Sequence, residues 1–553
     1  MVIALVAAGC ATDVDPELTL LPADSTVPPT TDPAPPDEPE EGAEADQPPP
    51  TTTTEPVPTT IAPVIEQRVG NPLRAVTAAG DVLGSRSDNI ITFEAIPYGE
   101  APTAQRRFEP PVTDLVFEGD FDASTPGSSC PQNDTHVSVQ FFPAPAFAED
   151  CLTLDVFTPA TGDDLPVMVW FHGGDFVSGS AHTDAYDGAN LARRDVVVVN
   201  VNYRIDALGF LVTEDMARDA AGEPFGNRGL QDQIAALGWI QQNIRDFGGD
   251  PANVTIFGQG SGARSVCGHL ASPMSAGLFS KAILHSGGAC DSILTIEEAI
   301  DRGEQWLAET SCAEAGEVVG CLQFLGIDDL LAASEQSGVT FDLVADGVLL
   351  DRSAFSLASS DELGSVPLLI GSTLDEGTLF VAGADEPTDQ ELRDLVLVEL
   401  EGNTDLLLSQ YEAIETNLAK QATFLTDSRF ACASDRLASA AGDEAVVHTY
   451  QFVHRSTDML PELGATHGSD LILLFGNPQA VEGLDLDELN ADDQLVADFL
   501  ATAWTTFAAE GTPGAGTDWP PYLDSSPAHL LIGAENTVSA TVQDGRCEIL
   551  SAR

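Results

Sequence analysis

The chain has 553 residues, with 88 Asp or Glu against only 22 Lys or Arg, and its formal net charge is -66. Phosphate backbones are bound through cationic side chains, so this balance argues against nucleic acid as a partner. Length alone would allow roughly three or four domains, but the motifs from Val69 onward fit a single fold with long loops, and we expect one large domain.

Two explanations compete for the acidity of the chain. A strongly acidic surface suits saline surroundings, where salt screens the repulsion between like charges. Alternatively, the charge could steer cationic ligands toward a site. The acidic residues are spread along the whole sequence and are not gathered near its motifs, which favours the surface explanation.

Residues 1–10 are almost entirely apolar and end in small residues followed by Cys10. This stretch resembles a bacterial lipoprotein signal, in which Cys10 would become the lipidated first residue of the mature chain. It lacks the usual basic start and is too short to span a bilayer, so the alternative is an ordinary signal peptide with an incidental cysteine. We expect an extracytoplasmic protein, either secreted or attached to the membrane only through an N-terminal lipid anchor.

Residues 11–66 form a second segment with a distinct composition. They contain no Lys, no Arg and no aromatic residue, and Pro, Thr, Asp and Glu dominate. Such a segment cannot bury enough apolar surface to offset the entropy lost on ordering, so we expect a disordered tether. The folded domain should therefore cover residues 67–553.

Within this domain, short apolar runs alternate with helical patterns. The runs are bounded by Gly, Pro, Asn or Asp, as is typical of buried parallel strands. They cover residues 167–171, 196–201, 254–257, 282–284 and 366–370. Between two of them, apolar residues recur from Leu230 to Phe247 at steps of three and four, which predicts a helix covering the sheet. The alternation predicts an α/β fold with a mostly parallel central sheet and helices on both faces.

The segment after the predicted strand 254–257 has the spacing of a nucleophile elbow. In the pattern G-x-S-x-G, the nucleophile stands at a sharp strand-to-helix turn, and small residues two places to either side avoid collisions. Gly258 and Gly262 centre this pattern on Gly260, where the attacking serine would be. Centring it on Ser261 would place Gln259 where a glycine is needed. Ser261 is therefore interpreted as the neighbour of the nucleophile position.

Further motifs extend over most of the chain. They are Ile96-Pro97-Tyr98-Gly99-Glu100 with Arg107-Phe108, Glu149-Asp150-Cys151-Leu152, Val167 to Gly174, Asn202-Tyr203-Arg204, Ala207 to Leu211 and Gly229 to Pro251. In order and spacing they resemble the carboxylesterase type B family, which includes the cholinesterases. The resemblance implies an α/β-hydrolase fold with large insertions around the active-site mouth, and a structural ion pair between Arg107 and Glu149.

The same resemblance implies two members of a catalytic triad. Glu376 lies in a Gly-Ser-Thr-Leu-Asp-Glu-Gly sequence that matches the acid motif of the family, and His467 lies in a matching histidine loop. In such a triad the histidine is a general base and the acid orients its ring. The third member would be residue 260, and glycine has no atom that can attack an ester. A glycine here also resembles the neuroligin branch of the family, in which the fold serves as an adhesion surface.

An oxyanion hole is implied by the resemblance as well. Its backbone N–H donors would come from Gly174, Asp175 and Ser261. Any residue except proline supplies such a donor, so the hole can persist. The Asp175 carboxylate would oppose negative charge if it pointed inward, and could equally be a hydrogen-bonded loop residue.

Nine cysteines are present, and eight remain when Cys10 is set aside. The family resemblance implies disulfides between Cys130 and Cys151, Cys312 and Cys321, and Cys432 and Cys547. Cys267 and Cys290 would form a fourth disulfide or remain buried thiols. No Cys-x-x-Cys pair or histidine cluster has zinc-site spacing, and we expect neither a metal nor another cofactor.

Three functions are compatible with these features. The first is a cell-surface pseudo-hydrolase that binds a small ester-like ligand or a surface protein, and this reading is favoured by Gly260. The second is a working ester hydrolase that uses Ser261 or a water activated by His467. The third is a purely structural envelope protein in which the fold is a relic.

Overall fold

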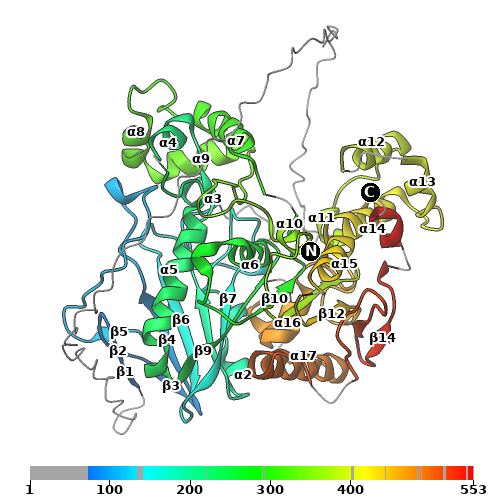
Figure 1. Cartoon of the computed structure of the whole chain (residues 1–553), viewed down its shortest axis with the longest axis horizontal. Coiled ribbons are helices and arrows are strands. Elements are labelled where there is room, and N and C mark those ends of the chain that lie inside the picture. The colour runs from blue at the N-terminus through cyan, green and yellow to red at the C-terminus, as the bar shows by residue number, and fades with distance from the viewer. Residues whose placement is uncertain are drawn as a thin grey trace, which may run out of the picture. The chain divides into compact units, whose positions relative to one another are not determined.

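The structure is a computed structural model (Figure 1). It describes residues 73–551 except 134–140, 221, 289, 292, 400–403, 443, 483, 485, 487, 515–517 and 544–545. The predicted signal segment 1–10, with Cys10, and the predicted tether 11–66 lie outside these residues. Among the helices that the structure describes, none is long and apolar enough to cross a membrane.

The centre of the domain is an 11-stranded sheet in the order β14-β13-β12-β11-β10-β9-β7-β8-β6-β4-β3. The strands are β3 (Ser85–Ser87), β4 (Ile90–Pro97), β6 (Thr153–Pro159), β7 (Leu165–Phe171), β8 (Val197–Val201), β9 (Gly249–Gln259), β10 (Lys281–His285), β11 (Leu368–Thr373), β12 (Val447–Phe452), β13 (His529–Ile532) and β14 (Thr537–Ser539). From β8 to β13 every neighbouring pair is parallel, and the outer pairs are antiparallel. A separate small sheet contains β1 (Arg74–Thr77), β2 (Gly80–Leu83) and β5 (Phe121–Asp122). The predicted mostly parallel sheet is confirmed.

Helices cover both faces of this sheet. Side chains along a strand alternate between the two faces, and here they are apolar on both. In β7, Val167, Val169 and Phe171 belong to one apolar cluster, which also contains residues of α5 (Arg228–Asn243) and α6 (Ser261–Ala271). Met168 and Trp170 belong to the other cluster, together with residues of α16 (Ser469–Phe475) and α17 (Ala491–Glu510). The helices are distributed around the sheet accordingly (Figure 1).

The predicted helix between β8 and β9 differs slightly from expectation at its end. The α-helix stops at Asn243, and the last apolar positions of the stripe lie in the 3-10 helix η3 (Ile244–Phe247). Gly248 then adopts a left-handed conformation and leads into β9. The apolar stripe nevertheless stays buried as predicted, because Leu230, Ile240 and Phe247 are fully covered.

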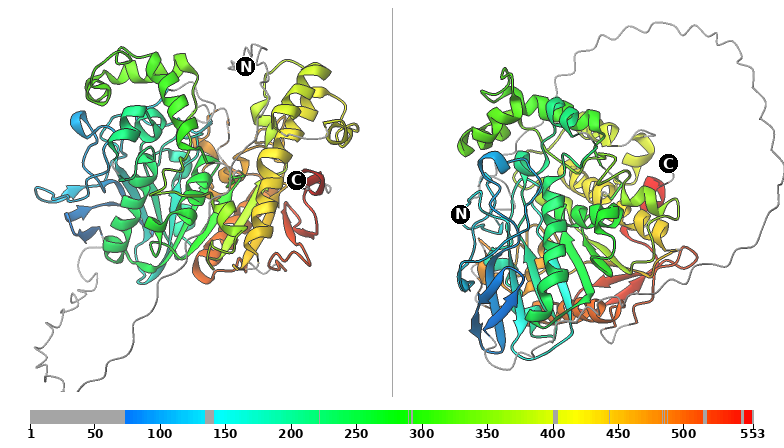
Figure 2. Two further views of the ribbon diagram at one scale, coloured as in Figure 1. Left: turned by 45° about the horizontal axis from the view of Figure 1, so that its top comes forward. Right: turned by 60° about the vertical axis from the view of Figure 1, so that its left-hand side comes forward.

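Further helices lie in long insertions between the strands. They are α7 (Ile296–Ala308), α8 (Val318–Phe324) and α9 (Ile327–Ser337) in one group, and α12 (Asp389–Glu399), α13 (Thr404–Ser409) and α14 (Asn417–Leu425) in another. Both groups project beyond the sheet at one end of the domain (Figures 1 and 2).

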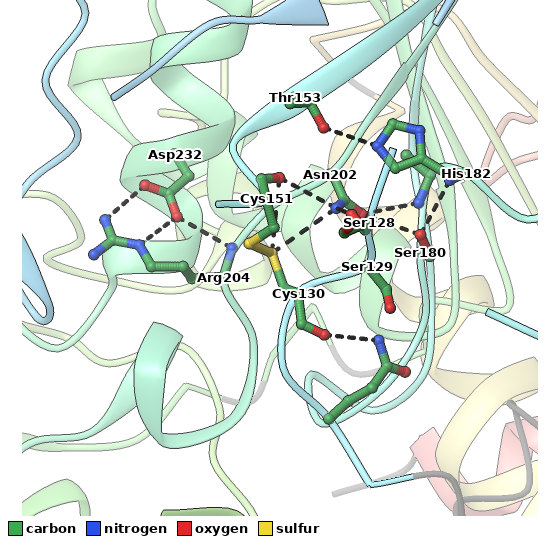
Figure 3. Close-up of a disulfide and its surroundings, with 12 residues drawn as sticks. Ser128, Ser129, Cys130, Cys151, Thr153, Ser180, His182, Asn202, Arg204 and Asp232 are labelled. Carbon is green, nitrogen blue, oxygen red and sulfur yellow. Dashed lines mark hydrogen bonds and ion pairs between the residues drawn. A yellow bond between two sulfur atoms is a disulfide. The ribbon is translucent and has the colours of Figure 1, made fainter. Parts of the chain in front are cut away.

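Within the described residues, four disulfides cross-link the chain, and Cys267, Cys321, Cys432 and Cys547 lie in helices. The three expected pairs are present, and Cys267 is joined to Cys290, which resolves the alternative that the sequence left open. Around the disulfide between Cys130 and Cys151, the amide of Asn202 donates to the carbonyl oxygen of Cys151 at 3.2 Å (Figure 3). The expected ion pair of Arg107 with Glu149 is also present, at 2.7 Å.

Candidate active site

The turn between β9 and α6 consists of one residue. β9 ends at Gln259 and α6 begins at Ser261, so Gly260 alone reverses the chain direction. Its φ of 57° and ψ of -121° lie in a region that residues with a side chain enter only under strain. The backbone N–H of Gly260 donates to the carbonyl oxygen of His285 at 3.0 Å, which ties the turn to the end of β10.

The two flanking glycines stand where no side chain fits. A Cβ atom on Gly258 would collide with the backbone of Gly262, and a Cβ atom on Gly262 would collide with the carbonyl oxygen of Phe171 in β7. These close approaches are the reason that the elbow pattern requires small residues two places from its centre. They favour the register expected from the sequence, with residue 260 at the tip.

The structure brings Glu376 and His467 together. Glu376 follows β11 and is fully buried, and one of its carboxylate oxygens accepts a hydrogen bond from the backbone N–H of Thr373 at 2.7 Å. The other oxygen lies 2.5 Å from Nδ1 of His467. In its contact with the carboxylate, Nδ1 is the donor, which leaves Nε2 as the ring nitrogen that can accept a hydrogen bond.

Two phenylalanine rings flank the imidazole. The ring centroids of Phe380 and Phe430 lie 5.3 and 4.9 Å from that of His467. Phe380 belongs to the short helix α11 (Gly377–Phe380), and Phe430 belongs to a π-helical turn, η5 (Thr426–Ala431). These contacts restrict the rotation of the His467 ring and shield it from water, although Phe380 itself is 45% exposed.

A side chain at position 260 would point toward this histidine. A Cβ atom on Gly260 would lie 3.2 Å from Nε2 of His467, and the next nearest atom is Cε1 of the same ring, at 3.7 Å. In the structure, the amide nitrogen of Gln259 lies 2.8 Å from Nε2. Sequence reasoning did not anticipate this contact; the only signal was a polar residue between two glycines of the elbow.

Ser261 has a different partner. Its Oγ atom accepts a hydrogen bond from the backbone N–H of Phe176 at 3.1 Å, and the residue is only 3% exposed. Among the hydrogen bonds of the residues that the structure describes, none joins Ser261 to His467. As the first residue of α6, Ser261 also has a backbone N–H without an intrahelical acceptor.

The loop that follows β7 contains the other two expected oxyanion donors. Gly174, Asp175 and Phe176 all have positive φ values, so the chain is tightly coiled there. The Asp175 side chain is 52% exposed and pairs with Arg264 at 2.5 Å. Arg264 also pairs with Asp342 at 2.6 Å. The Asp175 carboxylate is therefore directed to the surface, where it shares the guanidinium of Arg264 in α6 with Asp342.

A buried polar cluster supports the elbow from the β10 side. Nδ1 of His285 lies 2.9 Å from a carboxylate oxygen of Asp470, and the indole N–H of Trp504 donates to Nε2 of His285 at 2.7 Å. The backbone oxygen of His285 is the acceptor for Gly260. Sequence reasoning missed this cluster, because its members come from β10, α16 and α17.

No group of three or more His, Cys, Asp or Glu side chains suited to a metal ion occurs within the described ranges. The polar groups that the structure places at the elbow are His467, Glu376, Gln259 and the backbone N–H groups of the two loops.

A mostly parallel sheet covered on both faces, with a strand-to-helix elbow facing a histidine paired with an acid, defines an α/β-hydrolase. The sequence pattern of the Carboxylesterase family matches residues 71–550. The chain belongs to this family.

Curated proteins to which the chain is similar include esterases. The para-nitrobenzyl esterase of Bacillus subtilis (strain 168) is 33% identical over 474 residues, which cover 84% of this chain and 95% of the relative. The cocaine esterase of Homo sapiens is 31% identical over 523 residues, or 87% of this chain and 91% of that one. Among solved structures, a PNB esterase at 31% identity has a TM-score of 0.78 and is covered to 99%, with 86% of this chain matched.

Proposed function

We propose that this carboxylesterase-family protein has lost or strongly reduced ester hydrolysis and binds a small ester-like ligand or a surface protein through the former active site. The observation that carries the proposal is the residue facing His467. Position 260 is glycine, and its missing side chain would point at Nε2 from 3.2 Å. Removing the nucleophile of a serine-hydrolase triad typically lowers kcat by about six orders of magnitude.

The position of Ser261 supports the same reading. Its hydroxyl oxygen accepts a hydrogen bond from Phe176 and has no hydrogen bond to His467 among the described residues. A nucleophile needs a base within hydrogen-bond reach of its own oxygen. Ser261 would have to break the bond to Phe176 and change its orientation before it could attack.

An active ester hydrolase remains the second candidate. It is favoured by the intact pair of Glu376 and His467, whose 2.5 Å contact would have no catalytic use in a pure binding protein. In that case a water molecule activated by His467, or Ser261 itself, would replace the missing hydroxyl.

Two reagents distinguish these candidates. Purified protein is incubated with p-nitrophenyl acetate to measure turnover and with a fluorophosphonate to label a reactive serine. We expect neither turnover above that of a His467→Gln variant nor labelling. Rapid turnover with a label on Ser261 would overturn the proposal. Slow turnover that produces no label and disappears in His467→Gln would indicate a water molecule activated by His467.

Restoring the nucleophile gives a complementary test. Gly260→Ser should introduce fluorophosphonate labelling at residue 260, because its hydroxyl would be directed at His467. Gly238→Ser is the matched control, since Gly238 lies on α5 and an added Cβ there would meet no neighbouring atom within 4 Å, including none of the His467 ring. Absence of labelling in both folded Gly260→Ser and folded Gly260→Ser/Gln259→Met would mean that residue 260 is not presented to the histidine.

We also propose that the protein is extracytoplasmic and anchored through Cys10. The four disulfides support an oxidising compartment. Metabolic labelling with an alkyne fatty acid in a bacterial host should mark the wild-type chain and not Cys10→Ala. Equal labelling of the two chains would rule out the anchor at this residue.

A further inference from the structure

Both nitrogens of the His467 ring are engaged. Nδ1 faces the carboxylate of Glu376 at 2.5 Å, and Nε2 faces the amide nitrogen of Gln259 at 2.8 Å. Gln259 is 6% exposed, so its amide is held inside the site and is not a mobile surface group. In a working serine hydrolase, Nε2 is the atom that takes the proton of the nucleophile.

We propose that Gln259 is a positioning residue that holds His467 in an idle state, with Nε2 occupied by the amide of Gln259 in place of a nucleophile. This inference rests on the proposed function, because it takes residue 260 as the position facing His467. The Gln259 amide donates a hydrogen to the lone pair of Nε2 and so stabilises the neutral ring with its proton on Nδ1. A base whose lone pair is already bonded must lose that bond before it can accept a proton.

The contact of the Gln259 amide with Nε2 of His467 depends on the absence of a side chain at residue 260. A Cβ atom at 260 would lie 3.2 Å from Nε2, which is closer than ordinary van der Waals contact. A serine hydroxyl extending from that Cβ atom would compete with the Gln259 amide for the same lone pair. Gly260 therefore leaves Nε2 free for the amide, and we expect substitutions at 259 and 260 to be strongly non-additive.

The first experiment measures the 15N chemical shifts of the two His467 ring nitrogens. Full-length protein is labelled with 15N-histidine, and the His467 signals are assigned by comparison with His467→Gln. Gln259→Met keeps the length of the side chain and removes the donor, so the Nε2 resonance should move toward that of an unbonded acceptor nitrogen. Gln259→Glu presents only acceptor oxygens at neutral pH, so Nε2 should gain a proton.

Gln241→Met is the matched control for this experiment. The amide of Gln241 donates to the backbone oxygens of Pro251 and Leu278, away from His467. It should leave the His467 signals unchanged, and circular dichroism should confirm that all variants are folded. Identical His467 resonances in wild-type and folded Gln259→Met would overturn the inference.

The second experiment tests competition with a restored nucleophile. In Gly260→Ser, fluorophosphonate labelling forms a bond between the serine oxygen and phosphorus, expels fluoride and transfers the hydroxyl proton to Nε2 of His467. We expect the double variant Gly260→Ser/Gln259→Met to label about tenfold faster than Gly260→Ser, which corresponds to roughly one net hydrogen bond. Gly260→Ser/Gln241→Met should label at the rate of Gly260→Ser.

The outcomes separate the two proposals. Equal labelling rates in Gly260→Ser and the double variant would contradict the role of Gln259 and leave the loss of hydrolysis standing. Rapid turnover by the wild-type protein would contradict the proposed function. If no serine variant is labelled, residue 260 does not face the histidine, and the 15N signals of Gln259→Met then decide whether Gln259 occupies Nε2.

Discussion

The Oγ atom of Ser261 accepts a hydrogen bond from the backbone N–H of Phe176 at 3.1 Å. This bond connects the first residue of α6 to the loop that follows β7, and both residues are buried. The Ser261 side chain thus holds the loop that follows β7 against the turn at Gly260.

Replacing Ser261 with alanine should destabilise the fold. The substitution leaves the buried N–H of Phe176 without its acceptor, which costs about 1–3 kcal/mol. Urea unfolding followed by fluorescence would measure the loss. Ser124→Ala, which removes an exposed hydroxyl bonded to Asp122, should change the free energy of unfolding by less than about 0.5 kcal/mol. Equal stabilities of the two variants would contradict this role of Ser261.

The close packing of the elbow predicts that alanine substitutions at two glycines have opposite effects on the free energy of unfolding. Gly262→Ala forces a Cβ atom against the carbonyl oxygen of Phe171, so the free energy of unfolding should fall by about 1–3 kcal/mol or more. Gly238→Ala, on α5 in open space, should raise it by roughly 0.5–1 kcal/mol because alanine favours the helix. Thermal unfolding of both variants gives the comparison, and a tolerated alanine at 262 would argue against a tight turn centred on 260.

The buried side chain of His269 should make the free energy of unfolding fall at acidic pH. Burial lowers the pKa of His269 to about 3, below the ordinary value of 6.5. Between pH 6.5 and pH 3, the His269 side chain therefore binds a proton in the unfolded chain and not in the folded chain. The stability present above pH 6.5 is lost progressively as the pH falls toward 3. At pH 5 this one group should lower the free energy of unfolding by about 2 kcal/mol.

His269→Gln isolates that contribution. Between pH 7 and pH 5, the wild-type protein should lose about 2 kcal/mol more than the variant, as measured by urea unfolding at each pH. Carboxylates titrate equally in both proteins and cancel in the difference. Parallel pH curves would mean that the folded protein accommodates the proton.

The net charge of -66 predicts a response to salt. Mutual repulsion among the carboxylates destabilises the compact state, and added salt screens it. The thermal midpoint should therefore rise as NaCl is added from low ionic strength, and it should rise to the same extent with KCl at equal ionic strength. A flat or falling midpoint would count against the interpretation of the acidity as a surface suited to saline surroundings.

Much of the fold could be predicted from the sequence because it depends on local patterns. The apolar runs that became β7, β8, β9, β10 and β11 are bounded by turn residues, and the stripe of α5 repeats at helical spacing. The spacing of Gly258 and Gly262 indicated which residue the elbow would present. The pairing of Glu376 with His467 was implied only by the resemblance of the motifs around them to the carboxylesterase family, because 91 residues separate the two in the chain.

Other features were decided only by the tertiary structure, because they depend on which groups meet in space. The direction of the Asp175 side chain depends on Arg264 in α6, and the pairing of Cys267 with Cys290 depends on how the loop after β10 returns to that helix. The Gln259 amide could be assigned to Nε2 of His467 only once β9 and the histidine loop were placed side by side. The sequence by itself determined that residue 260 carries no hydroxyl, whereas the folded chain decided which groups lie beside the His467 ring.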